Sequence, residues 1–171
     1  CGLWGKSPGD LIQAAGKTEW NEALLLGWTH AANRHGDPEW AEALLRWDGL
    51  QGGKLPHAAP LRQHVPPERM EVLVLETLKA HPDSLFEEGI DDGHPALGLL
   101  SSMRGPWSER LTQAVVRSLR QRITQGASRD RGVWELRAGL KEFALRAPSH
   151  LADELGAGWP TDAKEWPAWA G

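Results

Sequence analysis

Apolar residues recur at intervals of three and four along most of this chain, and that spacing predicts amphipathic helices. The clearest case is one phrase that occurs twice, EWNEALL at residues 19–25 and EWAEALL at residues 39–45. A second tryptophan follows each copy about two turns later, at Trp28 and at Trp47. An offset of twenty residues is one helix plus a turn, so we predict that the two copies are successive helices of one antiparallel pair.

Helix boundaries are marked by residues with strong positional preferences. Ser7 followed by Pro8 predicts a short helix that ends at Ala15, because serine caps a helix and proline suits its first turn. Asp37 followed by Pro38 predicts another helix start of the same kind. The connection before Asp37 is short, and we therefore expect the flanking helices to fold back on each other.

Each predicted helix has a definite apolar face. For the first copy of the phrase we expect the buried residues to be Trp20, Ala23, Leu24, Gly27, Trp28 and Ala31. For the second copy they are Trp40, Ala43, Leu44 and Trp47. A helix that begins at 66–67 and ends before His81 should bury Met70, Leu73, Val74, Thr77 and Leu78. The longest helix, from about Ser108 to Gln125, should bury Leu111, Ala114, Val115, Leu119 and Ile123.

The segment 50–65 breaks this pattern, because its glycines and prolines leave no period of either kind. We interpret it as a linker loop that crosses the surface between an N-terminal helical block, 1–49, and a C-terminal helical block, 66–171. The two blocks are expected to form one continuous domain, within a fragment of a longer protein. No alternating strand pattern occurs, so the predicted fold class is all-α, with antiparallel helix pairs stacked as a short α-solenoid.

Composition narrows the function only slightly. The formal net charge of −4 is mild and by itself indicates neither a nucleic-acid nor a membrane partner. Ten tryptophans could form a stacking platform for bases or sugars, but their helical spacing favours a role in the core. With Cys1 as the single cysteine, no disulfide forms within the chain, which is typical of a cytoplasmic protein.

Catalytic and metal-binding patterns are missing from the sequence. His30 and His35 are five positions apart, which spreads them around a helix and prevents them from sharing an ion. The acidic stretch at 87–94 lacks the ligand order of a calcium loop, and a helix dipole explains its charge without an ion. Neither a nucleophile elbow nor a phosphate-binding glycine loop occurs. We therefore predict no catalytic residue, no metal and no cofactor.

Charge is distributed unevenly along the chain. Between Arg104 and Arg146 ten basic residues face four acidic ones, a net charge of +6. Arginine binds carboxylates and phosphates through a planar fork of donors, so this segment is a candidate surface for an anionic partner. The simpler interpretation is a solvated helix face balanced by the acidic remainder of the chain. The candidate binding residues are Arg110, Arg117, Arg120 and Arg131.

Several stretches give the chain a family resemblance. They are HPALGLL at 94–100, GPWS at 105–108, the helix at 111–119, WELR at 134–137 and the segment 151–160. With these stretches the chain resembles the C-terminal part of an uncharacterised bacterial family that has HEAT-like helical repeats. The resemblance covers about Trp20 to Pro160 and implies a cytoplasmic protein with a HEAT-like α-solenoid and no assigned activity. It transfers no functional residue.

Two hypotheses about function follow. The first is a protein-interaction scaffold without catalytic activity, in which stacked helices offer a binding face to a protein partner. The alternative is a nucleic-acid-binding protein, similar to the HEAT-like DNA glycosylases, that uses the arginine-rich 104–146 face. Neither hypothesis involves a membrane, because no apolar run is long enough to span one.

Overall fold

A computed structural model describes residues 6–15, 21–85, 95–125 and 145–147. In this part of the chain every regular element is a helix, which confirms the all-α class. The elements are α1 (Pro8–Ala15), α2 (Asn21–His35), α3 (Pro38–Leu50), the 3-10 helix η1 (Ala59–His64), α4 (Pro67–Ala80), α5 (Pro95–Ser102) and α6 (Glu109–Gln125).

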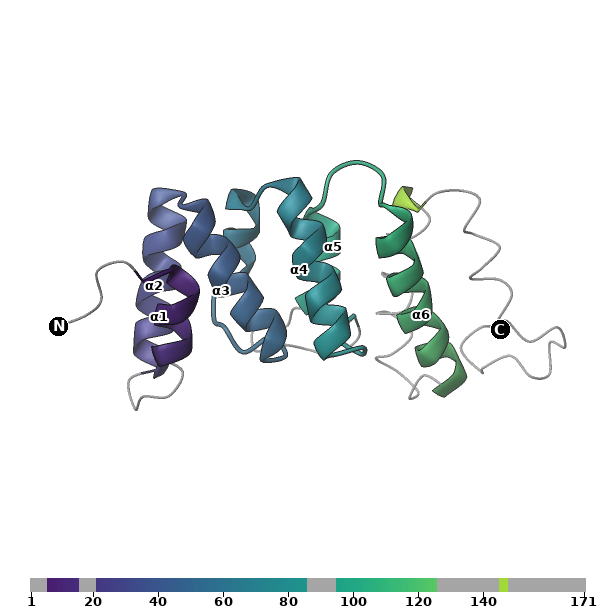
Figure 1. Ribbon diagram of the computed structural model, residues 1–171, viewed down its shortest axis with the longest axis horizontal. Coiled ribbons are helices and arrows are strands. Elements are labelled where there is room, and N and C mark those ends of the chain that lie inside the picture. Colours follow the sequence, from purple (N-terminus) through teal and green to yellow (C-terminus); the bar gives the residue numbers. More distant parts are fainter. Residues whose placement is uncertain (1–5, 16–20, 86–94, 126–144, 148–171) are drawn as a thin grey trace, which may run out of the picture.

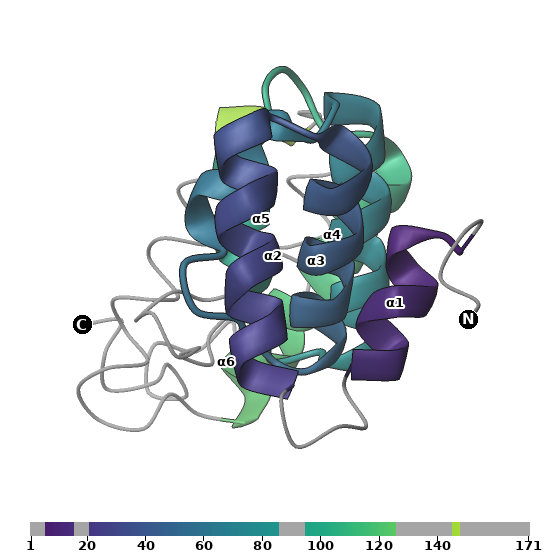
Figure 2. The same ribbon diagram turned by 90° about the vertical axis from the view of Figure 1, so that its left-hand side faces the viewer.

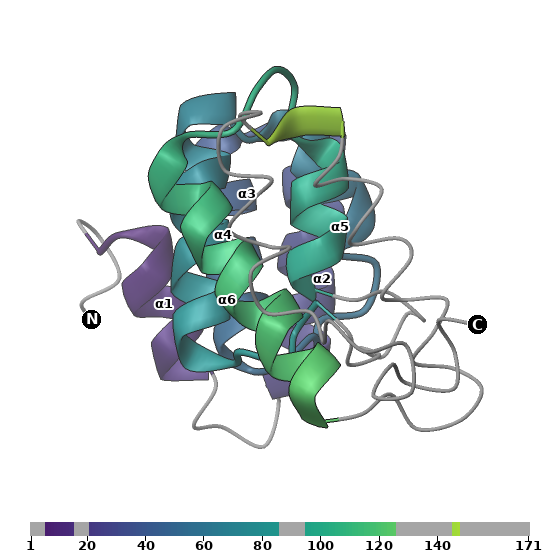
Figure 3. The same ribbon diagram turned by 90° about the vertical axis from the view of Figure 1, so that its right-hand side faces the viewer.

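The helices are arranged in two layers (Figure 1). α3, α4 and α6 lie next to one another in one layer, and α2 and α5 lie in the other. Figure 2 shows α2 and α3 side by side at one end, with α1 on the outer side of α3. Figure 3 shows the opposite end, where α6 covers α4. The short connection at residues 36–37 makes α2 and α3 antiparallel, as the sequence predicts.

Helix α3 is the central element of this arrangement, since it contacts α1, α2, η1, α4 and α5. Its closest approach to α4 is at Gly49, where an ideal Cβ would overlap the Thr77 hydroxyl group and lie 3.2 Å from the Thr77 Cβ. Only glycine leaves room for this contact. Gly49 and the preceding Asp48 are both buried within α3.

The predicted helix starts are confirmed by their hydrogen bonds. Asp37 caps α3, and its Oδ1 accepts hydrogen bonds from the backbone amides of Glu39 at 3.0 Å and Trp40 at 3.2 Å. Ser7 and Asp10 cap α1 reciprocally, because the Ser7 Oγ accepts from the Asp10 amide and the Asp10 carboxylate accepts from the Ser7 amide. These local signals fix the ends of the helices independently of tertiary packing.

The buried face predicted for α2 is wrong. Its buried residues are Leu25, Thr29 and Ala32, whereas most of the predicted ones are exposed. Leu24, for example, is 39% exposed, while the equivalent Leu44 in α3 is fully buried. The repeated phrase is therefore buried differently in its two copies. The physical reason is position, since α2 lies at the end of the stack and α3 has neighbours on several sides.

Residues 50–65 also differ from the prediction of a surface crossing. Four apolar side chains of this segment are buried in the core, namely those of Leu55, Ala58, Leu61 and Val65. A hydrogen bond connects the start of the segment to α3, because the Asp48 Oδ1 accepts from the Leu55 amide at 2.7 Å. The sequence pattern does not predict this burial, because the glycines and prolines among the buried residues hide any helical period.

The apolar faces predicted for the C-terminal helices are confirmed where the structure describes them. In α4 the buried residues are the predicted Met70, Leu73, Val74, Thr77 and Leu78. In α6, Leu111, Val115 and Leu119 are buried and Ala114 packs against the core. The Ile123 side chain lies outside the described residues. Both helices have neighbours along one whole side, so the sequence period matches the buried stripe.

Four of the ten tryptophans lie in the described part of the chain, and all four contact the core. Trp107 is buried, and Trp28, Trp40 and Trp47 pack against the core while partly exposed. The rings of Trp28 and Trp40 have centroids 5.3 Å apart and an interplanar angle of 48°. Trp20, the first tryptophan of the repeated phrase, lies outside the described residues.

None of the helices in the described ranges is both long enough and apolar enough to cross a membrane.

We predict opposite effects of alanine at two helical glycines. Gly49→Ala should lower the free energy of unfolding by about 1–2 kcal/mol, because the new methyl group forces α3 away from Thr77. Gly27→Ala should raise it by about 0.5–1 kcal/mol, because Gly27 has open space around it and alanine favours a helix. Urea denaturation followed by circular dichroism measures both. Equal effects in the two variants would show that the α3–α4 contact does not require glycine.

A second prediction concerns the Trp28–Trp40 pair. Alanine substitutions made singly and together should give a coupling free energy of about 0.5–1.5 kcal/mol, as is typical of aromatic pairs in contact. The same cycle with Trp47, which has no ring contact with Trp28 in the described structure, should be additive within about 0.5 kcal/mol. A strictly additive Trp28–Trp40 pair would mean that the stacking contributes nothing beyond burial.

Candidate functional site

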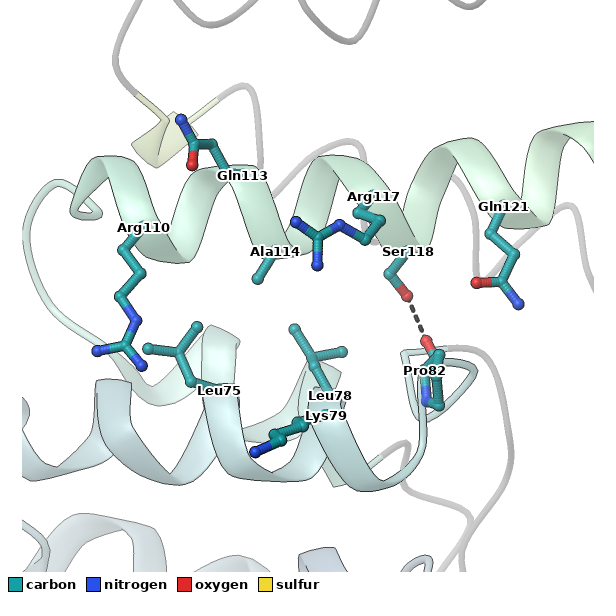
Figure 4. Close-up of a pocket in the computed structure, with 10 residues that line it drawn as sticks. All are labelled: Leu75, Leu78, Lys79, Pro82, Arg110, Gln113, Ala114, Arg117, Ser118 and Gln121. Carbon is teal, nitrogen blue, oxygen red and sulfur yellow. Dashed lines mark hydrogen bonds between the residues drawn. The ribbon is translucent and has the colours of Figure 1, made fainter.

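A groove of about 420 Å³ lies between α4 and α6 and opens to solvent (Figure 4). It is bounded by the end of α4, the turn that follows it, and one side of α6. The residues that line it are Leu75, Leu78, Lys79, Pro82, Arg110, Gln113, Ala114, Arg117, Ser118 and Gln121. Basic, amide and apolar side chains are all present, and no acidic side chain is among them.

The floor of the groove is apolar. Leu75 and Leu78 point from α4 toward α6, and Ala114 points back from α6 toward them (Figure 4). At one end the hydroxyl group of Ser118 donates a hydrogen bond to the backbone oxygen of Pro82, which ties α6 to the turn after α4. This bond and the apolar contacts fix the width of the groove.

Three cationic side chains surround this floor. Arg110 extends from α6 toward Leu75 and Arg117 lies over the space between the helices, while Lys79 lines the groove from α4 with its amino group directed away from α6 (Figure 4). The two arginines are seven residues apart, or about 10 Å along the helix axis. None of the three cations has an ion pair among the described residues.

The neighbouring surface of α3 and α4 has the opposite character, because its charges neutralise one another. Glu42 accepts hydrogen bonds from Arg46 at 3.1 Å and from Arg69 at 2.8 Å, and Arg46 also donates to Glu76 at 2.8 Å. The hydrogen bond to Glu42 raises the pKa of the Arg69 guanidinium above its ordinary value. The arginines of this surface hold two helices together, whereas those of the groove do not.

This arrangement suits the binding of an anionic group attached to an apolar one. Arginine donates through a planar fork to carboxylate or phosphate, and lysine adds a point charge. Leu75, Leu78 and Ala114 offer apolar contact beside these donors.

The structure brings together two of the four arginines predicted from the sequence. Arg110 and Arg117 are exposed and line the groove. Arg120 does not line it and is only partly exposed, with a buried Nε, because its position on the helix turns it away from Arg117. Arg131 lies outside the described residues. Sequence reasoning missed Lys79, which belongs to another helix and has no periodic relation to the arginines.

The histidines and acids considered from the sequence form no metal site in the described part of the chain. No group of three or more His, Cys, Asp or Glu side chains there could hold an ion. The fold does bring together two histidines that are distant in sequence, since the rings of His30 and His57 have centroids 5.6 Å apart. The acidic stretch at 87–94 lies outside the described residues.

The whole chain, residues 1–171, matches a family of unknown function, DUF5691, and it therefore belongs to that family. The membership confirms the expected relation to an uncharacterised family and assigns no role to any residue. Neither the curated proteins nor the solved structures include a match to the chain.

We predict that the groove cations are dispensable for folding. The double variant Arg110→Gln/Arg117→Gln should change the free energy of unfolding by less than about 0.5 kcal/mol, because neither side chain has an ion pair in the described structure. Glu42→Gln should lower it by about 1 kcal/mol, because it weakens two charge-assisted hydrogen bonds, one from Arg46 within α3 and one from Arg69 of α4. Urea denaturation of the wild type and both variants measures these free energies of unfolding. A larger loss in the arginine variant would assign the groove cations a structural role.

Proposed function

We propose that this member of a family of unknown function is a helical-repeat interaction scaffold without catalytic activity of its own. Its binding face is the groove between α4 and α6, and its partner is a protein that presents an acidic, amphipathic segment. We further propose that the two helical layers belong to a short HEAT-like α-solenoid, an architecture in which adjacent helix pairs form extended binding surfaces. The protein acts in the cytoplasm in this proposal.

One observation supports the proposal, namely that three cations line a groove with an apolar floor and have no ion pair among the described residues. Arg110, Arg117 and Lys79 have no ion pair in the described structure, although the arginines on the α3–α4 surface are paired. Arg110 and Arg117 lie beside the partly exposed Leu75 and Ala114, and arginine is enriched at protein interfaces. This combination of cationic and apolar side chains favours a binding surface over a helix face that is only solvated.

The partner's chemistry follows from the lining of the groove. The apolar floor requires an apolar contact, and the cations on both sides of it require carboxylates. A helix with leucines at intervals of three and four and with glutamates beside them offers both. Arg110 and Arg117 lie about two turns apart on one side of α6, a spacing that such a helix matches along its length.

The alternative is a nucleic acid bound by the arginine-rich 104–146 face, in the manner of a DNA-glycosylase-like protein. Glu42 and Glu76 neutralise Arg46 and Arg69 on the α3–α4 surface, so that surface offers no net attraction to a long phosphate backbone that extends beyond the groove. The apolar floor gives a phosphate backbone no matching contact. A short acidic peptide avoids both problems, because it fits within the groove.

Fluorescence anisotropy with a labelled leucine–glutamate helical peptide tests the proposal on the full chain. At about 50 mM salt the peptide should bind, and Arg110→Glu/Arg117→Glu should weaken binding at least about tenfold, because the variant replaces attraction by repulsion. A peptide with glutamine in place of every glutamate should bind weakly to both proteins. Circular dichroism checks that the variant remains folded.

The matched control reverses a charge outside the groove. Arg34→Glu changes an exposed arginine of α2, in the other layer, and should leave peptide binding within about twofold. Equal peptide binding by the wild type and the groove variant would overturn the proposal. Tighter binding of duplex DNA than of the peptide, with a steep dependence on salt, would favour the nucleic-acid alternative instead.

A further inference from the structure

We propose that a second cavity, separate from the groove, binds a small molecule that carries an oxyanion, with Arg62 as its main contact. The cavity has a volume of about 450 Å³ and lies between the 59–67 segment and the residues at the end of α5. It is lined by Ala59, Pro60, Arg62, Gln63, Val65, Pro67, Met70, Ser102, Met103 and Arg104. The proposal does not depend on the function assigned to the groove.

The Arg62 guanidinium group packs against α5 at Gly98, where the missing side chain leaves room for it. An ideal Cβ at Gly98 would overlap the guanidinium carbon and both terminal nitrogens of Arg62. The guanidinium group therefore lies directly against the helix backbone, and any residue other than glycine would displace it. A glycine in the middle of a helix lowers helix stability by about 0.5–1 kcal/mol relative to alanine. Gly98 therefore makes room for the Arg62 guanidinium group at the expense of the stability of α5.

The charge of Arg62 is incompletely compensated within the described structure. Its Nε atom is buried and has no hydrogen-bond acceptor there, and Arg62 is in none of the ion pairs. Burial lowers the pKa of the Arg62 guanidinium below its ordinary value, and the attraction of Asp48 offsets part of this effect. The carboxylate of Asp48 already accepts a hydrogen bond from the Leu55 amide.

Two further features make the cavity electropositive. Arg104 adds a second cation to its lining, and no acidic residue is present in that lining. Helix α4 begins at the same cavity, since its first residue, Pro67, is one of the lining residues. The N-terminus of α4 has no side-chain cap, and the positive end of its dipole favours a nearby anion.

The remaining lining defines the rest of the ligand. Val65, Met70 and Met103 provide apolar contacts, while Gln63 and Ser102 contribute polar groups. A volume of about 450 Å³ is within the range of small-molecule sites and is too small for a folded partner. The expected ligand therefore has a carboxylate or phosphate group and a short apolar portion. Both oxyanions fit the fork of an arginine.

Nuclear magnetic resonance of the arginine Nε–H groups in the full chain tests the proposal. Inorganic phosphate and butyrate are titrated separately at constant ionic strength, with chloride as the reference anion. The Arg62 Nε–H signal, assigned by its loss in Arg62→Lys, should shift saturably with one or both anions. Saturation by phosphate alone would identify a phosphate ligand, and tighter binding of butyrate would identify a carboxylate with an apolar portion.

Three variants connect the shift to the cavity, with circular dichroism as the check of folding. Arg104→Gln, a change at an exposed side chain, should weaken anion binding about threefold, as measured at the Arg62 signal. Gly98→Ala should weaken it at least about tenfold by displacing the guanidinium group. Arg34→Gln, outside the cavity, should leave it unchanged. No saturable shift with either anion, or equal binding by all variants, would overturn the proposal.

Discussion

The contact between Gly49 of α3 and Thr77 of α4 sets the spacing on which the described structure depends. It brings two helices so close that a methyl group at Gly49 would overlap Thr77. Asp48, the preceding residue, is buried and uses its carboxylate to hold the Leu55 amide, so the same turn of α3 also directs the chain into the 59–64 helix. One turn of helix thus positions both the neighbouring helix α4 and the connection that leads to it.

Helix α4 takes part in both cationic sites, with different residues at its two ends. Its first turns contribute Pro67 and Met70 to the cavity beside Arg62, and its last turns contribute Leu75, Leu78 and Lys79 to the groove beside α6. Along the same stretches of α4, Arg69 and Glu76 form ion pairs with α3. These ion pairs hold α4 against α3, whereas the cations that line the groove and the cavity have no ion pair among the described residues.

Local patterns predicted those parts of the fold that depend on local physics. Capping residues gave the starts of α1 and α3, and the period of three and four gave the buried stripe of α4, because one side of that helix is covered along its length. The same period failed in α2, where Leu24 is exposed although Leu44 in the identical phrase is buried. Burial in α2 depends on which neighbours exist, and a helical period carries no information about them.

The candidate sites likewise combine residues that a local sequence pattern predicts with residues that only tertiary packing brings together. Arg110 and Arg117 were predictable because their spacing on one helix places them on one side. Lys79 joins them from α4 through tertiary packing alone, and the sequence offers no indication of it. Arg62 was equally hidden, since its position depends on Gly98, which is 36 residues away along the chain. Contacts between helices therefore determine both sites more than the residues of any one helix do.

The contrast between paired and unpaired arginines also affects how fast and from which direction a charged molecule approaches. Beyond about 8 Å in physiological salt, most of the field of any single charge is screened. Within that range an acidic molecule is attracted by Arg110 and Arg117 but meets the neutralised α3–α4 surface with no net attraction. Encounters over the groove are thus longer-lived than encounters beside it, and the structure selects an orientation before any apolar contact forms.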